Sequence, residues 1–400
     1  MIRTDVVVVG GGLLGCATAW TLARDGVGVV LLERDQINAH ASGQNAGSLH
    51  FQLEYRMVER GLEAAQVAAE AMPLHLDAAA RWSELGEAFG PSLGVAQTGG
   101  LMLAETADQA RVLEAKGDLE RSHGLDVRLL SGDEIRDVAP YLSPSIVAAA
   151  FCPIEGKADT RTAAPALARA AADLGAQVST RTEVVGLRRV GRGWQVSTRH
   201  TDAVGNQVGE EIQADVVLLA AGVWTQHLGQ MVGLDLPIIP LALQMNVTAR
   251  TPKFLPHLVQ HAGERLSLKQ SQDGTVLIGG GWPARLRRDA SGRPRLSERP
   301  HLLHDSVVGN ARAALRAVPR LAGIPLLRTW VGMTTVAEDQ LPVVGPVPGR
   351  PGLFLATGGS AFTLGPTFAR VLADLAQGLE PTIDLAPYGP QRFGESIDVA

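Results

Sequence analysis

The sequence predicts an α/β fold in which one domain is assembled from separated segments and a β-rich domain is inserted between them. An apolar strand, a glycine-rich turn and a helical pattern open the chain at 5–25. Apolar strands followed by small residues recur at 216–224 and 353–366, whereas short β segments dominate 236–282. Alternating strand and helix patterns occur at the start, in the middle and at the end of the chain, so these segments are expected to come together in one domain.

Bulk composition indicates a globular protein without nucleic-acid partners. Hydrophobic residues make up 46% of the 400 residues and charged residues 19%, and the net charge is -5 with basic residues spread along the chain. The only cysteines are Cys16 and Cys152, with no metal-binding spacing. No apolar run suits a signal peptide or a membrane span, so a soluble cytoplasmic protein is expected.

The first elements form a compact βαβ pattern. Residues 5–9 are wholly apolar, as expected for a strand buried on both faces, and 14–25 have helical spacing of Leu14, Ala17 and Leu22. A second apolar strand follows at 29–32. The unit has about thirty residues, the usual size of such a crossover.

The remaining elements follow from periodicity and turn residues. The hairpin "LSLKQSQDGTVLIGGGW" is expected to turn at Asp273-Gly274, and short β segments begin at 178. The polar stretch 284–300 predicts a loop. Helical patterns cover 56–88, 107–122, 162–174, 305–317 and 366–377.

Three glycines in "VVVVGGGLLGCATAW" indicate a dinucleotide site. Gly10, Gly12 and Gly15 match G-x-G-x-x-G directly after a strand, so the backbone can approach a pyrophosphate at the helix N-terminus. Glu33 ends the next strand 18 residues after Gly15, where a carboxylate binds ribose hydroxyls. A purely structural strand-to-helix corner is the alternative.

Two further stretches favour FAD over a nicotinamide cofactor, for which the first unit alone would suffice. "VVLLAAGVW" is a second apolar strand that ends in small residues. "ATGGSAFTLGPTFARVLADL" is another strand, glycine turn and helix, and Pro366 suits the first helical turn. The positive end of that helix would stabilise the charge of a reduced isoalloxazine.

The stretches "ASGQNAG", "AAGVWT", "DQLPVVG" and "GGSAFTLGP", together with the glycine corner, resemble the D-amino-acid oxidase-like flavoproteins. That family includes glycine and sarcosine oxidases, D-amino-acid dehydrogenases and β subunits of opine, proline and hydroxyproline dehydrogenases; the hairpin resembles the β subunits most. The resemblance implies a Rossmann-like FAD-binding domain and an inserted antiparallel β-sheet substrate-binding domain. We expect the first in 1–75, 141–235 and 326–400, and the second in 76–140 and 236–325.

The motif and the resemblance together assign cofactor contacts along the chain. The histidine or cysteine that covalent members use is not found, so non-covalent FAD is expected. The assigned residues are Gly10, Gly12, Leu13, Leu14, Gly15, Glu33, Arg34, Ser42, Gly43, Gln44, Asn45, Ala46, Gly47, Leu49, Val184, Ala220, Ala221, Gly222, Trp224, Gly332, Gly358, Gly359, Ser360, Phe362, Thr363 and Leu364.

The resemblance also implies hydride transfer from an amine carbon to flavin N5, giving an imine that water hydrolyses. Amino-acid oxidases of the family often have W-x-G-x-R-P, in which the arginine binds the substrate carboxylate. In this chain Trp330 and Gly332 are followed by Thr334, which carries no charge. The candidates for another cation are Lys269, Arg265, Arg328 and His50, and a surface or structural role is the alternative for each.

The sequence therefore predicts an FAD-dependent amine oxidoreductase with His50, Lys269 and Thr334 as candidate catalytic residues. A small amine substrate is expected: a D-amino acid, an N-alkyl amino acid or an opine. The alternatives are a flavin-carrying subunit that passes electrons to a partner with flavin or iron–sulfur, and a nicotinamide dehydrogenase. No metal site is expected, because Pro256 and the β texture around His257 and His261 argue against a helical pair of ligands.

Overall fold

The computed structural model describes residues 2–201 and 207–394, and its internal contacts divide the chain into two compact units. Unit 1 comprises Met1–Gly43, Arg161–Pro240 and Thr334–Ala400, and unit 2 comprises Gln44–Thr160 and Leu241–Met333. The predicted cofactor domain also contained 44–75, 141–160 and 326–333, which lie in unit 2, whereas 236–240, predicted in the substrate domain, lie in unit 1. The function of each domain stays a prediction.

Unit 1 is built on a largely parallel sheet. Six of its eight strands follow the order β17-β18-β11-β1-β2-β8, in which only the edge strand β17 runs antiparallel to its neighbour. The other two, β9 (Thr182–Val190) and β10 (Gly193–Thr201), extend β11 as an antiparallel ribbon. The βαβ prediction at the start of the chain is confirmed. The strands of that order are β1 (Ile2–Val9), β2 (Val29–Leu32), β8 (Gln177–Ser179), β11 (Gln207–Leu219), β17 (Val343–Pro346) and β18 (Leu353–Thr357).

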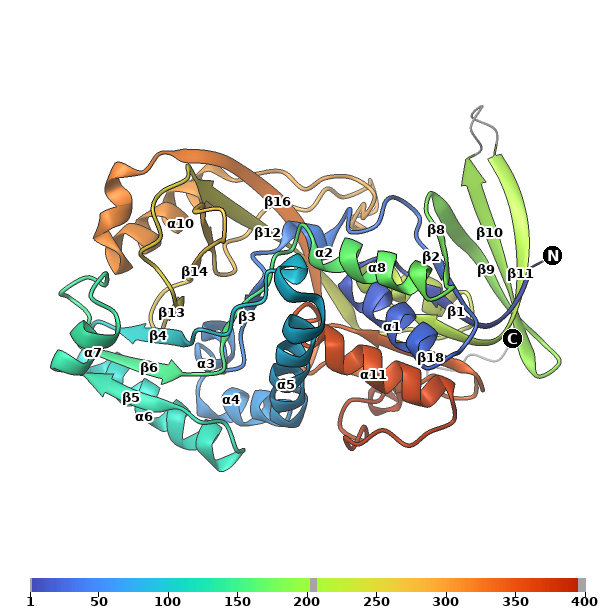
Figure 1. Ribbon diagram of the computed structural model, residues 1–400, viewed down its shortest axis with the longest axis horizontal. Coiled ribbons are helices and arrows are strands. Elements are labelled where there is room, and N and C mark those ends of the chain that lie inside the picture. The colour runs from blue at the N-terminus through green and yellow to red at the C-terminus, as the bar shows by residue number, and fades with distance from the viewer. Residues whose placement is uncertain (1, 202–206, 395–400) are drawn as a thin grey trace. The chain divides into compact units, whose positions relative to one another are not determined.

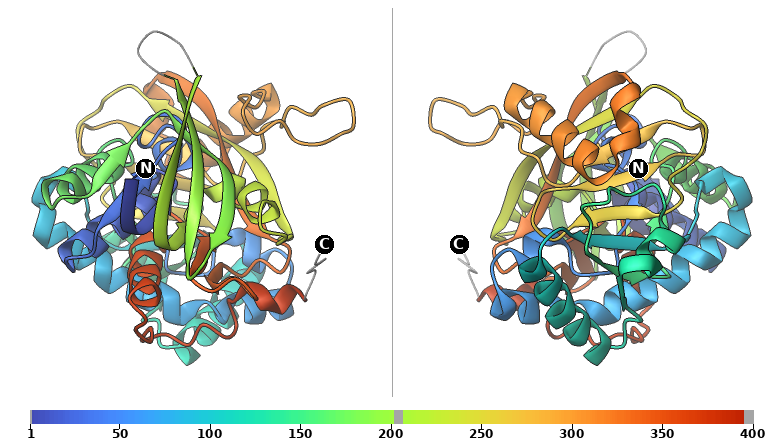
Figure 2. Two further views of the ribbon diagram at one scale, coloured as in Figure 1. Left: turned by 90° about the vertical axis from the view of Figure 1, so that its right-hand side faces the viewer. Right: turned by 90° about the vertical axis from the view of Figure 1, so that its left-hand side faces the viewer.

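Both faces of this sheet are covered, which explains why the valine run is apolar without alternation. Val7 and Val9 lie in a buried cluster with Trp194 of the antiparallel ribbon β9, β10 and β11. Val6 and Val8 are also buried and point to the other face. The helices of unit 1 lie beside this sheet (Figures 1 and 2): α1 (Leu13–Arg24) packs between α8 (Ala163–Asp173) and α11 (Gly365–Ala376).

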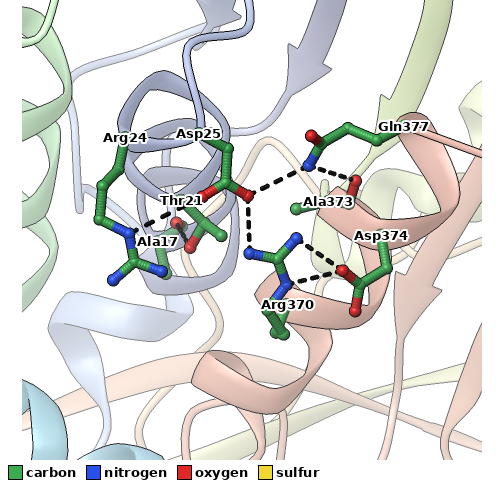
Figure 3. Close-up of polar contacts among 8 residues, drawn as sticks. All are labelled: Ala17, Thr21, Arg24, Asp25, Arg370, Ala373, Asp374 and Gln377. Carbon is green, nitrogen blue, oxygen red and sulfur yellow. Dashed lines mark hydrogen bonds and ion pairs between the residues drawn. The ribbon is translucent and has the colours of Figure 1, made fainter. Parts of the chain in front are cut away.

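An ion-pair network joins the C-terminal end of α1 to α11 (Figure 3). Arg370 donates to Asp25 at 2.7 Å and to Asp374 at 2.6 Å, and Gln377 donates to Asp25 at 3.1 Å. Burial alone would raise the pKa of Asp25, but the hydrogen bonds and charge of Arg370 hold it below its ordinary value. This network fixes the N-terminal helix of the chain against its last long helix.

Unit 2 contains most of an eight-stranded sheet of order β16-β12-β15-β14-β13-β4-β6-β5, in which the first residues of β12 and the last residues of β16 belong to unit 1. The antiparallel prediction is wrong at one place, because β13 pairs parallel with β4. The hairpin is confirmed: β14 and β15 pair antiparallel across a turn in which Gly274 has φ of 87°. The strands are β4 (Gly100–Ala104), β5 (Arg128–Ser131), β6 (Ala148–Cys152), β12 (Ile238–Thr248), β13 (Leu258–His261), β14 (Ser267–Gln270), β15 (Val276–Gly279) and β16 (Leu326–Ala337).

The helical pattern predicted over 56–88 is divided into three helices in the structure. Gly61 has φ of 93° and interrupts the helix, and a new helix with Pro73 in its first turn begins after Ala71. The segment consists of α3 (Tyr55–Val58), α4 (Leu62–Ala69) and α5 (Met72–Phe89). The other predicted helices are confirmed within two residues, including α6 (Ala107–Ser122) and α10 (His304–Ala317), and 284–300 contains isolated bridges only.

The shorter elements are α2 (Ala41–Gln44), α7 (Gly132–Val138), α9 (Thr225–Gln230), β3 (Ser48–Leu49) and β7 (Gly156–Lys157). β3 and β7 form a separate two-stranded sheet. None of the helices in the described part of the chain combines the length and hydropathy that a membrane crossing requires.

Candidate functional site

In unit 1 the turn from β1 to α1 requires glycine at two positions for different reasons. Gly10 has φ of 118°, and a Cβ there would lie 2.5 Å from the Ala220 carbonyl oxygen. A Cβ on Gly15 would lie 1.8 Å from the Gly10 carbonyl oxygen. The first glycine therefore allows the turn beside β11, and the third allows α1 to pack closely on that turn.

The N-terminus of α1 offers amide donors to a ligand. The Leu13 amide donates to Ser42 Oγ at 2.9 Å, whereas the amides of Gly12, Leu14 and Gly15 make no hydrogen bond to another described residue. Such free amides at a helix N-terminus, with no side chain on Gly12, fit a pyrophosphate.

Glu33 braces the glycine turn. Its two carboxylate oxygens accept hydrogen bonds from the Gly11 and Asp35 amides, each at 2.7 Å, and the residue is buried. Burial and then the nearby Glu33 carboxylate raise the pKa of the Cys16 thiol, which keeps that cysteine protonated. Carboxylate oxygens accept more than one hydrogen bond, so a ribose contact by Glu33 stays a prediction.

The other two glycine turns lie next to the first. The Ala220 amide donates to the Val9 carbonyl oxygen at 2.9 Å, and Thr357 Oγ donates to the Gly222 carbonyl oxygen at 3.2 Å. β18, β11 and β1 are neighbours in the sheet, so the turns after these strands meet at one edge. The structure thus brings the N-terminal and C-terminal glycine turns together within unit 1.

The backbone of the last turn is unusual over three consecutive residues. Gly358, Gly359 and Ser360 have φ of 75°, 35° and 30°. Ser360 is one of few non-glycine residues with positive φ, a conformation that persists only where the surroundings impose it. The adjoining α11 starts against α1, because a Cβ on Gly365 would lie 3.1 Å from Leu13 Cδ2.

Arg34 and Trp224 are also brought together in unit 1. The Arg34 guanidinium lies 5.0 Å from the centre of the Trp224 ring, and the His40 ring packs against the same indole at a tilt of 59°, with ring centres 4.7 Å apart. Val184 is buried in the hydrophobic cluster of unit 1. Their cofactor contacts stay predictions.

In unit 2 the segment that follows Gly43 forms a tight loop. The Asn45 side chain accepts from the Gly47 amide at 2.6 Å, and Gly47 has φ of 70°. A Cβ on Gly47 would lie 2.7 Å from Lys269 Nζ. Trp330 Nε1 donates to the Gln44 carbonyl oxygen at 2.7 Å, so β16 holds the start of this loop.

Ser48 of β3 and His50, which directly follows β3, meet one face of β14. His50 Nε2 lies 3.0 Å from Ser267 Oγ, and Ser48 Oγ lies 3.1 Å from the same hydroxyl. Lys269, two residues further on the same face, donates to the Ala158 carbonyl oxygen at 3.2 Å. All four side chains are buried, and His50 Nδ1 makes no hydrogen bond to a described residue.

A buried charge network supports the chain directly after His50. Glu155 accepts from the Phe51 and Gln52 amides at 2.8 and 3.0 Å and from Gln52 Nε2 at 2.8 Å. Lys116 Nζ donates to Gln52 Oε1 at 3.0 Å and to Glu120 Oε2 at 2.7 Å. This network fixes the backbone that follows His50.

The other candidates lie elsewhere. Thr334 belongs to unit 1, Arg265 is exposed, and Arg328 is exposed over the Trp330 ring at 5.0 Å. His257 bonds to the Tyr141 hydroxyl at 2.8 Å, whereas His261 lies 3.5 Å from Glu105, so the two histidines have different protein partners. Sequence reasoning missed Ser267, although the alternation of Arg265, Ser267 and Lys269 against Leu266 and Leu268 was a usable signal.

The model for the family of FAD dependent oxidoreductases named DAO matches residues 5–375, and the chain belongs to that family. Glycine oxidase from Geobacillus kaustophilus is 29% identical over 400 residues, covering 99% of both proteins. The crystal structure of that enzyme matches with a TM-score of 0.80 over 98% of this chain and 99% of that chain. Glycine oxidase from Pseudomonas aeruginosa is 31% identical over 96% of this chain and 98% of that protein. One of the opine oxidase subunits of Rhizobium meliloti is 26% identical over 98% of both proteins.

Family membership confirms the predicted fold class and decides for FAD over a nicotinamide cofactor. The glycine turns of unit 1 fit this group, because they combine free helix-terminal amides with backbone that no side chain covers. Non-covalent attachment and the individual contacts stay predictions.

Proposed function

We propose that the protein oxidises the C–N bond of a small amine: a D-amino acid, an N-alkyl amino acid or an opine. The similarity to glycine oxidases and to an opine oxidase component over nearly the whole chain supports this class of reaction. FAD, when bound, would supply the two-electron acceptor for a hydride from the amine carbon, and water would hydrolyse the resulting imine.

The observation that carries the proposal is the buried Nδ1 of His50. A buried polar atom without a partner is costly and indicates a missing ligand or water. When Nε2–H donates to Ser267 Oγ, Nδ1 carries a lone pair and can accept the proton of a substrate ammonium. Removal of that proton provides the neutral amine from which hydride can leave.

Lys269 is the proposed partner of a substrate carboxylate. It is buried on the β14 face that carries Ser267, whereas Arg265 and Arg328 are exposed. Its ammonium can pair with a carboxylate as a point charge and does not need the fork of an arginine. Thr334 is then left as a proposed neutral contact, with no ionic role.

The proposal is tested by an anaerobic absorbance titration of the FAD-loaded protein. We expect the flavin band to bleach with at least one compound from a panel of sarcosine, glycine, D-alanine and a D-opine. Readmission of oxygen should restore the band if oxygen is the acceptor. If the flavin band recovers only when an artificial dye is added as electron acceptor, the protein is better described as a subunit that transfers electrons to a partner. No bleaching across the panel contradicts the proposal.

His50→Asn is expected to slow flavin reduction about 100-fold, because general base catalysis contributes about 10²–10⁴-fold. Stopped-flow reduction with the best substrate measures this, and flavin content reports on folding. The control is His123→Asn, an exposed histidine at the end of α6. Equal reduction rates in both variants would exclude His50 as the base.

The second candidate function is a flavin-carrying subunit of a larger dehydrogenase, favoured by the similarity to a component of opine oxidase. Cys16 and Cys152 are both buried, and burial raises the pKa of each thiol. Two such cysteines are too few for an iron–sulfur cluster, so a partner would have to carry it.

A further inference from the structure

Three groups that can carry positive charge meet around Pro256 in unit 2. Lys157 of β7 donates to the Pro256 carbonyl oxygen at 3.3 Å, His257 is the next residue, and Lys253 lies three residues before Pro256. Burial, and then the charge of Lys253, lowers the pKa of Lys157 to about 8. Burial, and then the charge of Lys157, lowers the pKa of His257.

No carboxylate balances this cluster within the described part of the chain. Neither lysine forms an ion pair with a described residue, and His257 bonds only to the Tyr141 hydroxyl, at 2.8 Å. The chain has four lysines, and one of them, Lys116, by contrast bonds to Glu120 at 2.7 Å. Lys157 is half-buried and Lys253 is exposed, and an anion near both would relieve the repulsion between their charges.

The loop that carries Lys253 is held firmly from β14. Gln270 Oε1 accepts from the Phe254 and Leu255 amides at 2.8 and 3.2 Å, and its Nε2 donates to the Thr251 and Gly274 carbonyl oxygens. The buried Gln270 therefore fixes the loop on both sides of Lys253.

The two other groups are also held in place. Lys157 exchanges backbone hydrogen bonds with Ala96 at 2.9 and 3.0 Å, and Thr98 Oγ donates to the same Pro256 carbonyl oxygen at 2.7 Å. His257 packs edge-on against Phe151, with ring centres 5.9 Å apart. The backbone that carries each of the three groups is thus fixed, and the Lys157 side chain is also held, which lowers the entropy cost of binding.

We propose that Lys157, Lys253 and His257 form a binding site for a small oxyanion, a carboxylate or a phosphate. An anion between the lysines supplies the absent counter-charge and forms charge-assisted hydrogen bonds with both ammonium groups. Lys157 pairs across the β3–β7 sheet with Ser48, so the site is a neighbour of the His50 cluster. The proposal does not depend on amine oxidation.

Isothermal titration of the FAD-loaded protein at low ionic strength, with inorganic phosphate and with acetate as probes, tests the site. We expect one-to-one binding of at least one probe, weakened about tenfold or more in Lys157→Gln/Lys253→Gln, because hydrogen bonds to charged groups contribute about 1.5–3 kcal/mol. Lys157→Arg, which keeps the charge, should retain most of the affinity. The probe that binds identifies the anion class.

The matched control is Arg250→Gln, which removes an exposed cation from the same loop and should bind like the wild type. Circular dichroism and flavin content establish that each variant is folded. Binding of neither probe at 10 mM (about 100-fold above an expected Kd of about 0.1 mM) overturns the proposal. Equal binding by wild type and the double-lysine variant also overturns it.

Discussion

Gly15→Ala is expected to yield a protein that is purified without its FAD. The new Cβ would lie 1.8 Å from the Gly10 carbonyl oxygen and 3.6 Å from Ala220 Cβ, and backbone atoms offer no flexible side chain that can move aside. Helix α1 must therefore shift away from β1, and the amides at its N-terminus leave their positions. Overpacking alone costs about 1–3 kcal/mol, and the lost phosphate contacts add to this effect.

Flavin content after purification and FAD titration of the apoprotein measure the loss, for which we expect at least a 100-fold weaker Kd. Gly323→Ala is the control, because a Cβ there meets no atom within 4 Å and the residue is exposed. Retention of stoichiometric FAD by Gly15→Ala would show that the glycine turn does not determine cofactor binding.

The first crossover could be predicted because its signals are local. Four valines, a glycine triplet and a helical pattern lie within thirty residues, and each glycine has a steric reason that the structure displays. The break in the 56–88 helix was less visible. Gly61 lies in an alanine-rich pattern, and only its positive φ reveals that it ends a helix.

Strand β6 (Ala148–Cys152) could not be predicted from its local composition. Its residues "AAAFC" have a helical composition and no period-two alternation. It forms a strand because it pairs with both β4 and β5, contacts that depend on segments far away in the chain. Tertiary pairing overrides local propensity at this position.

Some features of the candidate site could likewise be predicted from local sequence, and others could not. The three glycine turns were visible as strand–turn–helix patterns, although their meeting at one sheet edge depends on strand order. The burial of the charged residues in unit 2 could not be predicted from the sequence. Lys116 and Glu120 are spaced like an exposed i,i+4 pair, and their burial follows from contacts with Gln52 and Leu53 on a distant segment.

Lys116→Met is therefore expected to destabilise the protein by about 3–5 kcal/mol, because removing one partner of a buried ion pair leaves the other charge uncompensated. The side chains of Lys116 and Glu120 are 1% and 0% exposed. The matched control is Arg111→Met on the same helix, which breaks an ion pair with Asp108 whose partners are 71% and 83% exposed. Such exposed pairs contribute about 0–1 kcal/mol, and urea unfolding followed by tryptophan fluorescence distinguishes the two variants.

The loss should also depend on pH with a defined sign. Burial raises the pKa of Glu120 above its ordinary 4.5, and Lys116 opposes this rise, so Lys116→Met raises that pKa further. A folded-state pKa above the unfolded one means that stability is highest below pH of about 4.5 and falls as pH rises through the raised value. The difference in the free energy of unfolding between wild type and Lys116→Met should thus be larger at pH 8 than at pH 5.

The double variant Lys116→Met/Glu120→Gln removes both charges and keeps an acceptor for the Leu53 amide, so it should recover most of the stability. A loss equal to that of Arg111→Met, or one that is constant with pH, would mean that Glu120 is not held as a buried charge.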